Sequence, residues 1–206
     1  MDLKKSNARE DPRVLRTRKL LLQAFSELFV EKGFYAMTVQ DITERASVNR
    51  GTFYTHFEDK PAILECWLRE QFQEHIARKV LSSEPLSAST IRLLVGNVIE
   101  WFAQLHQLTR SADRALIPLV VTTLQEALFE LLWQGLKPAA GSGVGQRVDV
   151  ETVAMVTSWA IFGAGFQCFN QWDGQTTTVP ADELADQVTS TLLGGLAQAL
   201  PAFSLT

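Results

Sequence analysis

Cysteine and histidine are scarce in this sequence, with two of the former and three of the latter among 206 residues. Cys66 and Cys168 lack the spacing of a disulfide framework or a metal site, and His56, His75 and His106 are not spaced like metal ligands. We therefore expect no metal and no cofactor. Unpaired thiols fit a reduced, cytoplasmic setting.

A catalytic constellation is also missing. No nucleophile, base and orienting group stand out as a set. The glycine-rich run GSGVG, residues 141–145, follows no strand and lacks the lysine of a phosphate-binding loop. These absences predict that the protein is not an enzyme.

Charge is absent between Glu151 and Asp173, a stretch long enough to span a bilayer. The stretch contains several Thr, Ser, Gln and Asn residues and no flanking Lys or Arg cluster. A helix buried in a protein interface therefore explains it better than a membrane span. The opening MDLKKSNARED is charged and has no apolar segment of a secretory signal. We expect no membrane contact.

The charged residues are divided unevenly along the chain. Residues 1–60 carry 11 Lys or Arg and 9 Asp or Glu, a net charge of +2. Residues 61–206 carry 8 and 14, a net charge of −6, and the total is −4. The net charge argues against a protein that coats nucleic acid in general, and the N-terminal end is the more basic end by a small margin.

Apolar residues recur at helical spacing in long runs, and no segment has the alternation of a strand, which predicts an all-α fold. The composition of residues 82–89 indicates a linker, and that of residues 138–146 a flexible loop. The long helices are expected over residues 11–31, 60–81, 87–108, 115–137, 148–172 and 181–200.

Residues 38–60 predict two short helices joined by a tight turn, followed by the start of a long helix. Thr38 can open the first helix with a capping box, and Asn49 suits the N-cap of the second. Phe53 and Phe57 recur at the spacing of a buried helix face. The pattern is that of a helix-turn-helix, whose second helix enters the DNA major groove.

The outer face of the second short helix carries side chains suited to DNA. Arg50 can bond a guanine with two hydrogen bonds, and Thr52 offers a hydroxyl to a base or a phosphate. Tyr54, His56 and Lys60 are donors that suit phosphates. A plain helical hairpin is the alternative, but it leaves this face unexplained.

This region resembles the DNA-binding domain of TetR/AcrR-type transcriptional repressors over residues 16–68. One departure is Ser47, where members of the family usually carry a glycine in a left-handed turn, so that some backbone strain is expected. The matching residues are Phe25, Leu28, Phe29, Lys32, Gly33, Phe34, Thr38, Val39, Asp41, Ile42, Ala46, Val48, Gly51, Thr52, Phe53, Tyr54, His56, Phe57, Lys60 and Leu64.

The resemblance implies a double-stranded DNA operator and assigns roles position by position. The start of the first short helix should meet the DNA backbone, and Gln40 could also reach a base edge. The second helix should read the bases. The predicted DNA-binding residues are Thr38, Val39, Gln40, Asn49, Arg50, Gly51, Thr52, Tyr54, His56 and Lys60.

The last two helical runs suit a homodimer contact. Both are rich in small residues, which let helices approach closely, so that a pair from each subunit could form a four-helix interface. The family resemblance implies the same arrangement, and two motifs would then read a palindrome. The alternative is the core of a single subunit. The small residues are Ala160, Gly163, Ala164, Gly165, Gly194, Gly195 and Ala197.

The resemblance also implies a pocket for a small-molecule effector, apolar or aromatic, within the C-terminal helices. Each candidate residue could instead belong to the core. The candidates for effector binding are Trp101, His106, Phe129, Trp133, Trp159, Phe162 and Phe166.

The predicted architecture is all-α, with an N-terminal three-helix helix-turn-helix domain and a larger C-terminal helical domain for ligand binding and dimerisation. We expect an arm over residues 1–10, the DNA-binding domain over 11–60, a connecting helix over 60–81 and the C-terminal domain over 82–206. The predicted function is a ligand-responsive repressor. The alternatives are a redox-responsive regulator acting through Cys168 and a helical-bundle interaction protein without specific DNA binding.

Overall fold

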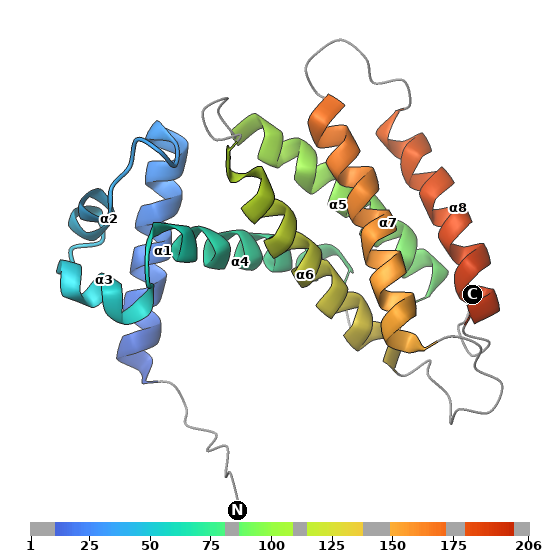
Figure 1. Cartoon of the computed structure of the whole chain (residues 1–206), viewed down its shortest axis with the longest axis horizontal. Coiled ribbons are helices and arrows are strands. Elements are labelled where there is room, and N and C mark those ends of the chain that lie inside the picture. Colours follow the sequence, from blue (N-terminus) through green and yellow to red (C-terminus); the bar gives the residue numbers. More distant parts are fainter. Residues whose placement is uncertain (1–10, 81–86, 109–114, 138–148, 172–179, 200–206) are drawn as a thin grey trace, which may run out of the picture. The chain divides into compact units, whose positions relative to one another are not determined.

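The computed structural model describes residues 11–80, 87–108, 115–137, 149–171 and 180–199, and these ranges form eight α-helices (Figure 1). They contain no strand, so the predicted all-α class is confirmed. The helices are α1 (Pro12–Lys32), α2 (Val39–Arg45), α3 (Arg50–His56), α4 (Lys60–Val80), α5 (Ala88–Leu108), α6 (Ile117–Leu136), α7 (Val150–Gln171) and α8 (Ala181–Ala199).

The chain divides into two compact units, residues 1–67 and 68–206, and the boundary falls within α4. The predicted arm at 1–10 and the predicted loop at 138–146 lie outside the described residues, as does most of the predicted linker at 82–89. The long helices begin and end within about two residues of the predicted positions wherever those positions are described.

Helix α1 begins and ends for local reasons. Oδ1 of Asp11 accepts the backbone N–H of Arg13 at 2.9 Å, and Pro12 stands in the first turn, where a missing N–H leaves no bond unmade. At the other end, Gly33 adopts a φ of 78°, which stops the helix. The buried face of α1 consists of Leu21, Leu22, Ala24, Phe25, Leu28 and Phe29.

A reciprocal capping box opens α2. The backbone N–H of Thr38 donates to Oδ2 of Asp41 at 2.7 Å, and the N–H of Asp41 donates to Oγ1 of Thr38 at 3.1 Å. The Thr38 hydroxyl, followed by the Lys32 ammonium, lowers the pKa of Asp41 from 3.8 to about 2. The stabilisation by this carboxylate is therefore present above pH 3.8 and is lost as the pH falls towards 2.

The turn into α3 passes through Ser47, whose φ of 55° lies in the left-handed region, as the sequence predicted. Oδ1 of Asn49 then accepts the N–H of Thr52 at 2.7 Å and so caps α3. Phe53 is fully buried, and Phe57 is 5% exposed. The predicted capping and inner face of this short helix are confirmed.

The larger unit is built around α7. This helix packs against α5, α6 and α8, and Figure 1 shows it between α6 and α8. The aromatic ring of Phe102 on α5 lies within 5.3 to 6.2 Å, centre to centre, of the rings of Trp101, Phe162 and Phe166. No described helix is both long enough and apolar enough to cross a membrane.

The small residues of α7 serve two different faces. Gly165 faces α5, where an added Cβ would lie 2.5 Å from Cδ2 of Phe102 and 3.1 Å from Cγ1 of Val98. Ala164 is also buried, whereas Ala160 and Gly163 are exposed. Close approach of helices within one subunit thus accounts for part of the pattern that the sequence assigned to a dimer contact.

Replacing Ser47 with glycine should stabilise the protein. Glycine has no Cβ, so it adopts the left-handed backbone without the steric clash that serine has there. We expect Ser47→Gly to raise the free energy of unfolding by about 0.5–1 kcal/mol, measured by urea denaturation. Ser26→Gly, in the interior of α1, is the control and should lower it by about 0.5 kcal/mol. A loss of stability in Ser47→Gly would contradict the assigned turn.

Gly165→Ala should destabilise the protein by about 1–3 kcal/mol, because the new methyl group meets a ring that is itself enclosed by other aromatic side chains. Gly96→Ala on α5 is the matched control, since no atom lies within 4 Å of the added Cβ. It should be neutral or stabilising by up to about 1 kcal/mol. Equal effects of the two substitutions in thermal unfolding would refute the close contact.

Candidate nucleic-acid interface and ligand groove

Helix α3 has an exposed polar face opposite its buried aromatic face. Arg50, Gly51 and Tyr54 are exposed, whereas Phe53 and Phe57 are buried. A short helix that turns its polar face outward beside a capped partner helix is the arrangement with which helix-turn-helix proteins enter the major groove.

The two largest exposed side chains of α3 contact each other. Nη2 of Arg50 donates to the Tyr54 hydroxyl at 3.3 Å, and the guanidinium carbon lies 5.7 Å from the centre of the tyrosine ring. Tyr54 in turn packs edge-on against Phe53, with ring centres 5.4 Å apart. The tyrosine therefore limits the positions of the guanidinium that is predicted to bond guanine.

Several other predicted DNA contacts already bond within their own helices. The Thr38 hydroxyl donates to Asp41, and the Thr52 hydroxyl donates to Oδ1 of Asn49 at 3.0 Å. Nε2 of Gln40 donates to Glu44 one turn along α2 at 2.8 Å. Of the predicted set, Thr38, Gln40, Asn49, Arg50, Gly51 and Tyr54 are exposed, and Val39, Thr52, His56 and Lys60 are half-buried.

Lys60 is bound within the N-terminal unit. Its Nζ donates to the backbone oxygens of Phe34 and Met37, both at 2.8 Å, and lies 4.3 Å from the centre of the Phe34 ring. These bonds fasten the start of α4 to the segment between α1 and α2. The predicted contact of Lys60 with phosphate stays a prediction, and it would have to form in addition to these bonds.

Charged side chains that have no distinguishing pattern in the sequence also hold the motif in place. Arg45 on α2 bonds Glu31 on α1 at 2.8 and 2.9 Å and Glu27 at 3.2 Å. The Arg45 guanidinium lowers the pKa of Glu31, and the two glutamates raise the pKa of Arg45. Arg18 on α1 donates to Sγ of Cys66 on α4 at 2.8 Å, and this bond joins the two helices. These partners lie far apart in sequence, where no local spacing reveals them.

In the larger unit, α7 leaves a row of mostly apolar side chains exposed. Met155 is 46% exposed, Val156 58% and Trp159 50%. We call this row, which consists of Thr152, Met155, Val156, Trp159, Ala160 and Gly163, the α7 strip. On the neighbouring α8, Gly194 and Gly195 are exposed, with no atom within 4 Å of an added Cβ. Both helices thus present surfaces that a second helix could approach closely.

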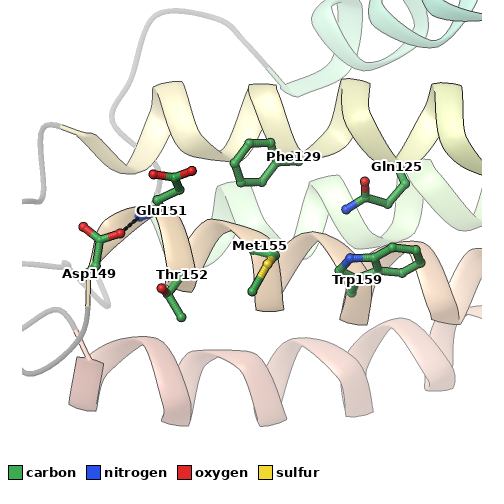
Figure 2. Close-up of a pocket in the computed structure, with 7 residues that line it drawn as sticks. All are labelled: Gln125, Phe129, Asp149, Glu151, Thr152, Met155 and Trp159. Atoms are coloured by element: carbon green, nitrogen blue, oxygen red, sulfur yellow. Dashed lines mark hydrogen bonds between the residues drawn. The ribbon is translucent and has the colours of Figure 1, made fainter.

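A groove of about 420 Å³ runs between α6 and α7 (Figure 2). Its volume lies in the range of sites for drug-sized molecules. Figure 2 shows the two carboxylates at one end, and Gln125 with Trp159 at the other. The lining residues are Gln125, Phe129, Asp149, Glu151, Thr152, Met155 and Trp159.

The predicted effector residues do not all lie together. Phe129 and Trp159 line the groove, whereas Trp101 and Phe162 are 6% and 3% exposed and belong to the aromatic core. Trp133 stacks on Phe129 one turn along α6, with ring centres 6.4 Å apart. His106 and Phe166 are half-buried and do not line the groove. The polar part of the lining could not be predicted from the sequence, because the acidic residues at the start of α7 have no distinguishing spacing.

Cys168 is buried on α7, and burial raises the pKa of its thiol. Thiolate is the form that reacts with oxidants, so this environment disfavours reaction. The geometry therefore does not favour the redox alternative.

Comparison with known proteins places these sites in a family context. The family model described as bacterial regulatory proteins, tetR family, matches residues 21–65. The chain is 37% identical over 76 residues to the uncharacterized regulator YxbF of Bacillus subtilis (strain 168), which covers 36% of this chain and 20% of YxbF. It thus spans about a fifth of the length of that relative.

Two further comparisons extend over both units. The HTH-type transcriptional repressor KstR2 of Rhodococcus jostii (strain RHA1) is 27% identical over 195 residues, covering 87% of this chain and 91% of KstR2. The crystal structure of RolR in complex with resorcinol superposes with a TM-score of 0.59 and 15% identity, over 92% of each chain. The fold is therefore shared along nearly the whole length.

The family match contains α2, α3 and the exposed face described above. The similarity to KstR2 continues through the C-terminal helices. Residues 21–65 therefore match the tetR family of bacterial regulatory proteins, and the chain as a whole is similar to a transcriptional repressor, KstR2.

Proposed function

We propose that the protein is a homodimeric repressor that leaves a palindromic DNA operator when a small apolar or aromatic molecule binds its C-terminal helices. The observation that carries the DNA part is the exposed polar face of α3, which is held in place by the buried Phe53 and the cap at Asn49. KstR2, the relative that spans both units, is named a repressor, which favours repression over activation. The proposed place of action is the cytoplasm.

The proposed DNA contacts divide by position. Arg50 reads a base, and Gly51 lets the backbone of α3 come close to the major groove of the DNA. Residues 38–40 at the start of α2 meet the DNA backbone. We assign these tasks to a domain of residues 11–60, and effector binding to residues 82–206, with α4 between them.

The proposed dimer forms through α7 and α8. The α7 strip exposes three large apolar side chains, and Gly194 and Gly195 leave the backbone of α8 open to close approach. A pair of such helices from each subunit forms a four-helix interface. Two recognition helices related by a two-fold axis then read half-sites about one turn of DNA apart.

Release from DNA requires a difference in affinity. An effector shifts a protein between two shapes only by as much as it binds one of them better. Met155 and Trp159 belong both to the groove and to the α7 strip, so a molecule in the groove would touch the residues that meet the other subunit. Helix α4 is the proposed connection to the DNA-binding unit.

The operator proposal is tested by fluorescence anisotropy with DNA from upstream of the protein's own gene. We expect salt-sensitive, sequence-specific binding with two chains per site. If that segment does not bind, selection from random DNA follows. Failure to obtain a palindromic sequence from either source would contradict the proposal.

Arg50→Ala should reduce the preference for the operator over random DNA by about 1–3 kcal/mol, because the bonds to one base pair are lost. Arg50→Lys is a more specific variant, since it keeps the positive charge but loses the planar guanidinium that can form two parallel hydrogen bonds to one base. Its salt dependence should match the wild type while its sequence preference falls. An unchanged preference in Arg50→Ala would show that another helix reads the bases.

Lys60→Ala should weaken binding to all sequences and reduce the salt slope by about 1 if Lys60 also reaches a phosphate. Loss of its two bonds to backbone oxygens should lower the free energy of unfolding by about 1–3 kcal/mol. Lys19→Ala, at an exposed position of α1, controls for the change in charge. If Lys60→Ala lowers the free energy of unfolding but leaves the salt dependence of DNA binding unchanged, Lys60 stabilises the fold and does not contact a phosphate.

A further inference from the structure

We propose that the groove between α6 and α7 binds an organic cation with an aromatic or apolar body. In this assignment Glu151 and Asp149 face the positive charge, and Phe129, Met155 and Trp159 cover the body. The inference rests on the proposed function, in which the C-terminal helices bind an effector, and it specifies the chemical class of that effector.

The charged side chains of the described lining have one sign. The residues that the structure describes in the groove include two carboxylates and no lysine, arginine or histidine. Among the described residues, neither Asp149 nor Glu151 forms an ion pair with a basic side chain. Asp149 has a local task, because its Oδ2 accepts the N–H of Glu151 at 3.1 Å at the start of α7. Figure 2 shows Glu151 at the same end of the groove as Asp149, drawn toward the ribbon of α6.

The polar atoms of the lining are mainly acceptors. One N–H of the Gln125 amide donates to Oγ of Ser158 at 3.2 Å, and Oε1 of the same amide can accept. Its second N–H, the Thr152 hydroxyl and the Trp159 indole N–H are the donors of the lining. The carboxylates of Asp149 and Glu151 accept only. A ligand that donates, or that carries a diffuse positive charge, complements this set.

The aromatic wall of the groove continues into a contact that already holds an ammonium group. Phe129 stacks almost parallel to Trp133, with an interplanar angle of 8°. The ammonium of Lys137 lies 3.5 Å from the centre of the Trp133 ring. This cation–π contact, one turn beyond the groove, shows the same row of rings binding a positive charge.

The other ligand classes fit the groove less well. An anion would face two carboxylates and would be repelled. A neutral apolar molecule would cover a carboxylate and remove its water without supplying a partner, which costs free energy. A cation supplies that partner, while its body covers the side chains of Met155 and Trp159, which are about half exposed.

The test uses three probes that share one ring system: (2-naphthylmethyl)trimethylammonium, 2-naphthalenemethanol and 2-naphthylmethanesulfonate. Their affinities for the full-length protein are measured by calorimetry and by saturation-transfer NMR, without DNA. We expect the cation to bind at least about tenfold more tightly than the alcohol, and the sulfonate not to bind. A preference for the alcohol or the sulfonate would overturn the inference.

Glu151→Gln keeps the size of the side chain and removes its charge. This substitution should lower the affinity for the cation by about tenfold, and it should leave the affinity for the alcohol unchanged or slightly higher. Glu100→Gln, at an exposed position on α5, is the control with the same change of charge and should alter neither affinity. An equal effect of both variants would show that the cation does not bind beside Glu151.

Phe129→Leu should lower the affinity for every probe that binds. An unchanged affinity would show that the ring of Phe129 does not contact the ligand.

A second measurement separates this inference from the proposed function. Each probe is added to the complex of the protein with its operator, followed by anisotropy. Binding of the cation that depends on Glu151 but leaves the operator complex intact would support the site and refute its role as an effector site. Release of the DNA by the alcohol but not by the cation would support the proposed ligand-responsive repressor and would refute the proposal that its effector is a cation.

Discussion

A helix of seven residues does not persist alone in water, and α3 therefore depends on what lies beneath it. Phe53 provides that support, since it is fully buried and its ring lies 5.8 Å from that of Phe57. The cap at Asn49 completes the first turn. Because one face is fixed by packing, the opposite face has a defined direction, which is what a surface that reads base edges needs.

Bonds between elements then set the position of the two short helices. Arg45 ties α2 to two glutamates of α1, and Lys60 ties α4 to the backbone just before α2. The pairs that are exposed contribute little stability individually, but together they restrict how the motif can shift. The larger unit uses a different means, because Gly165 lets α7 lie directly against the ring of Phe102.

The sequence predicted the features that depend on neighbours in the chain. The caps at Thr38 and Asn49 and the buried Phe53 follow from spacings of a few residues, whereas the left-handed Ser47 was expected from the family resemblance. Periodicity also predicted the buried side of α1, α4, α5 and α6. It could not say which buried side faces a cavity, so Trp101 was selected with Trp159 although only the latter lines the groove.

The remaining features arise from distant residues brought together by the fold. The groove exists because α6 and α7 lie side by side and bring an aromatic row against acidic residues. The acceptors of Lys60 are backbone oxygens 26 and 23 residues away, and no side-chain pattern marks them. The same holds for Arg45, whose partners are 14 and 18 residues distant.

The exposed α7 strip has a consequence for how the protein behaves as an equilibrium system. Met155, Val156 and Trp159 are about half exposed in the single subunit, and the proposed dimer would cover them. Folding and assembly are then linked, so the midpoint of thermal unfolding would rise with protein concentration. The amount of the regulator in the cell would thereby set both its occupancy of DNA and the fraction of chains that stay folded.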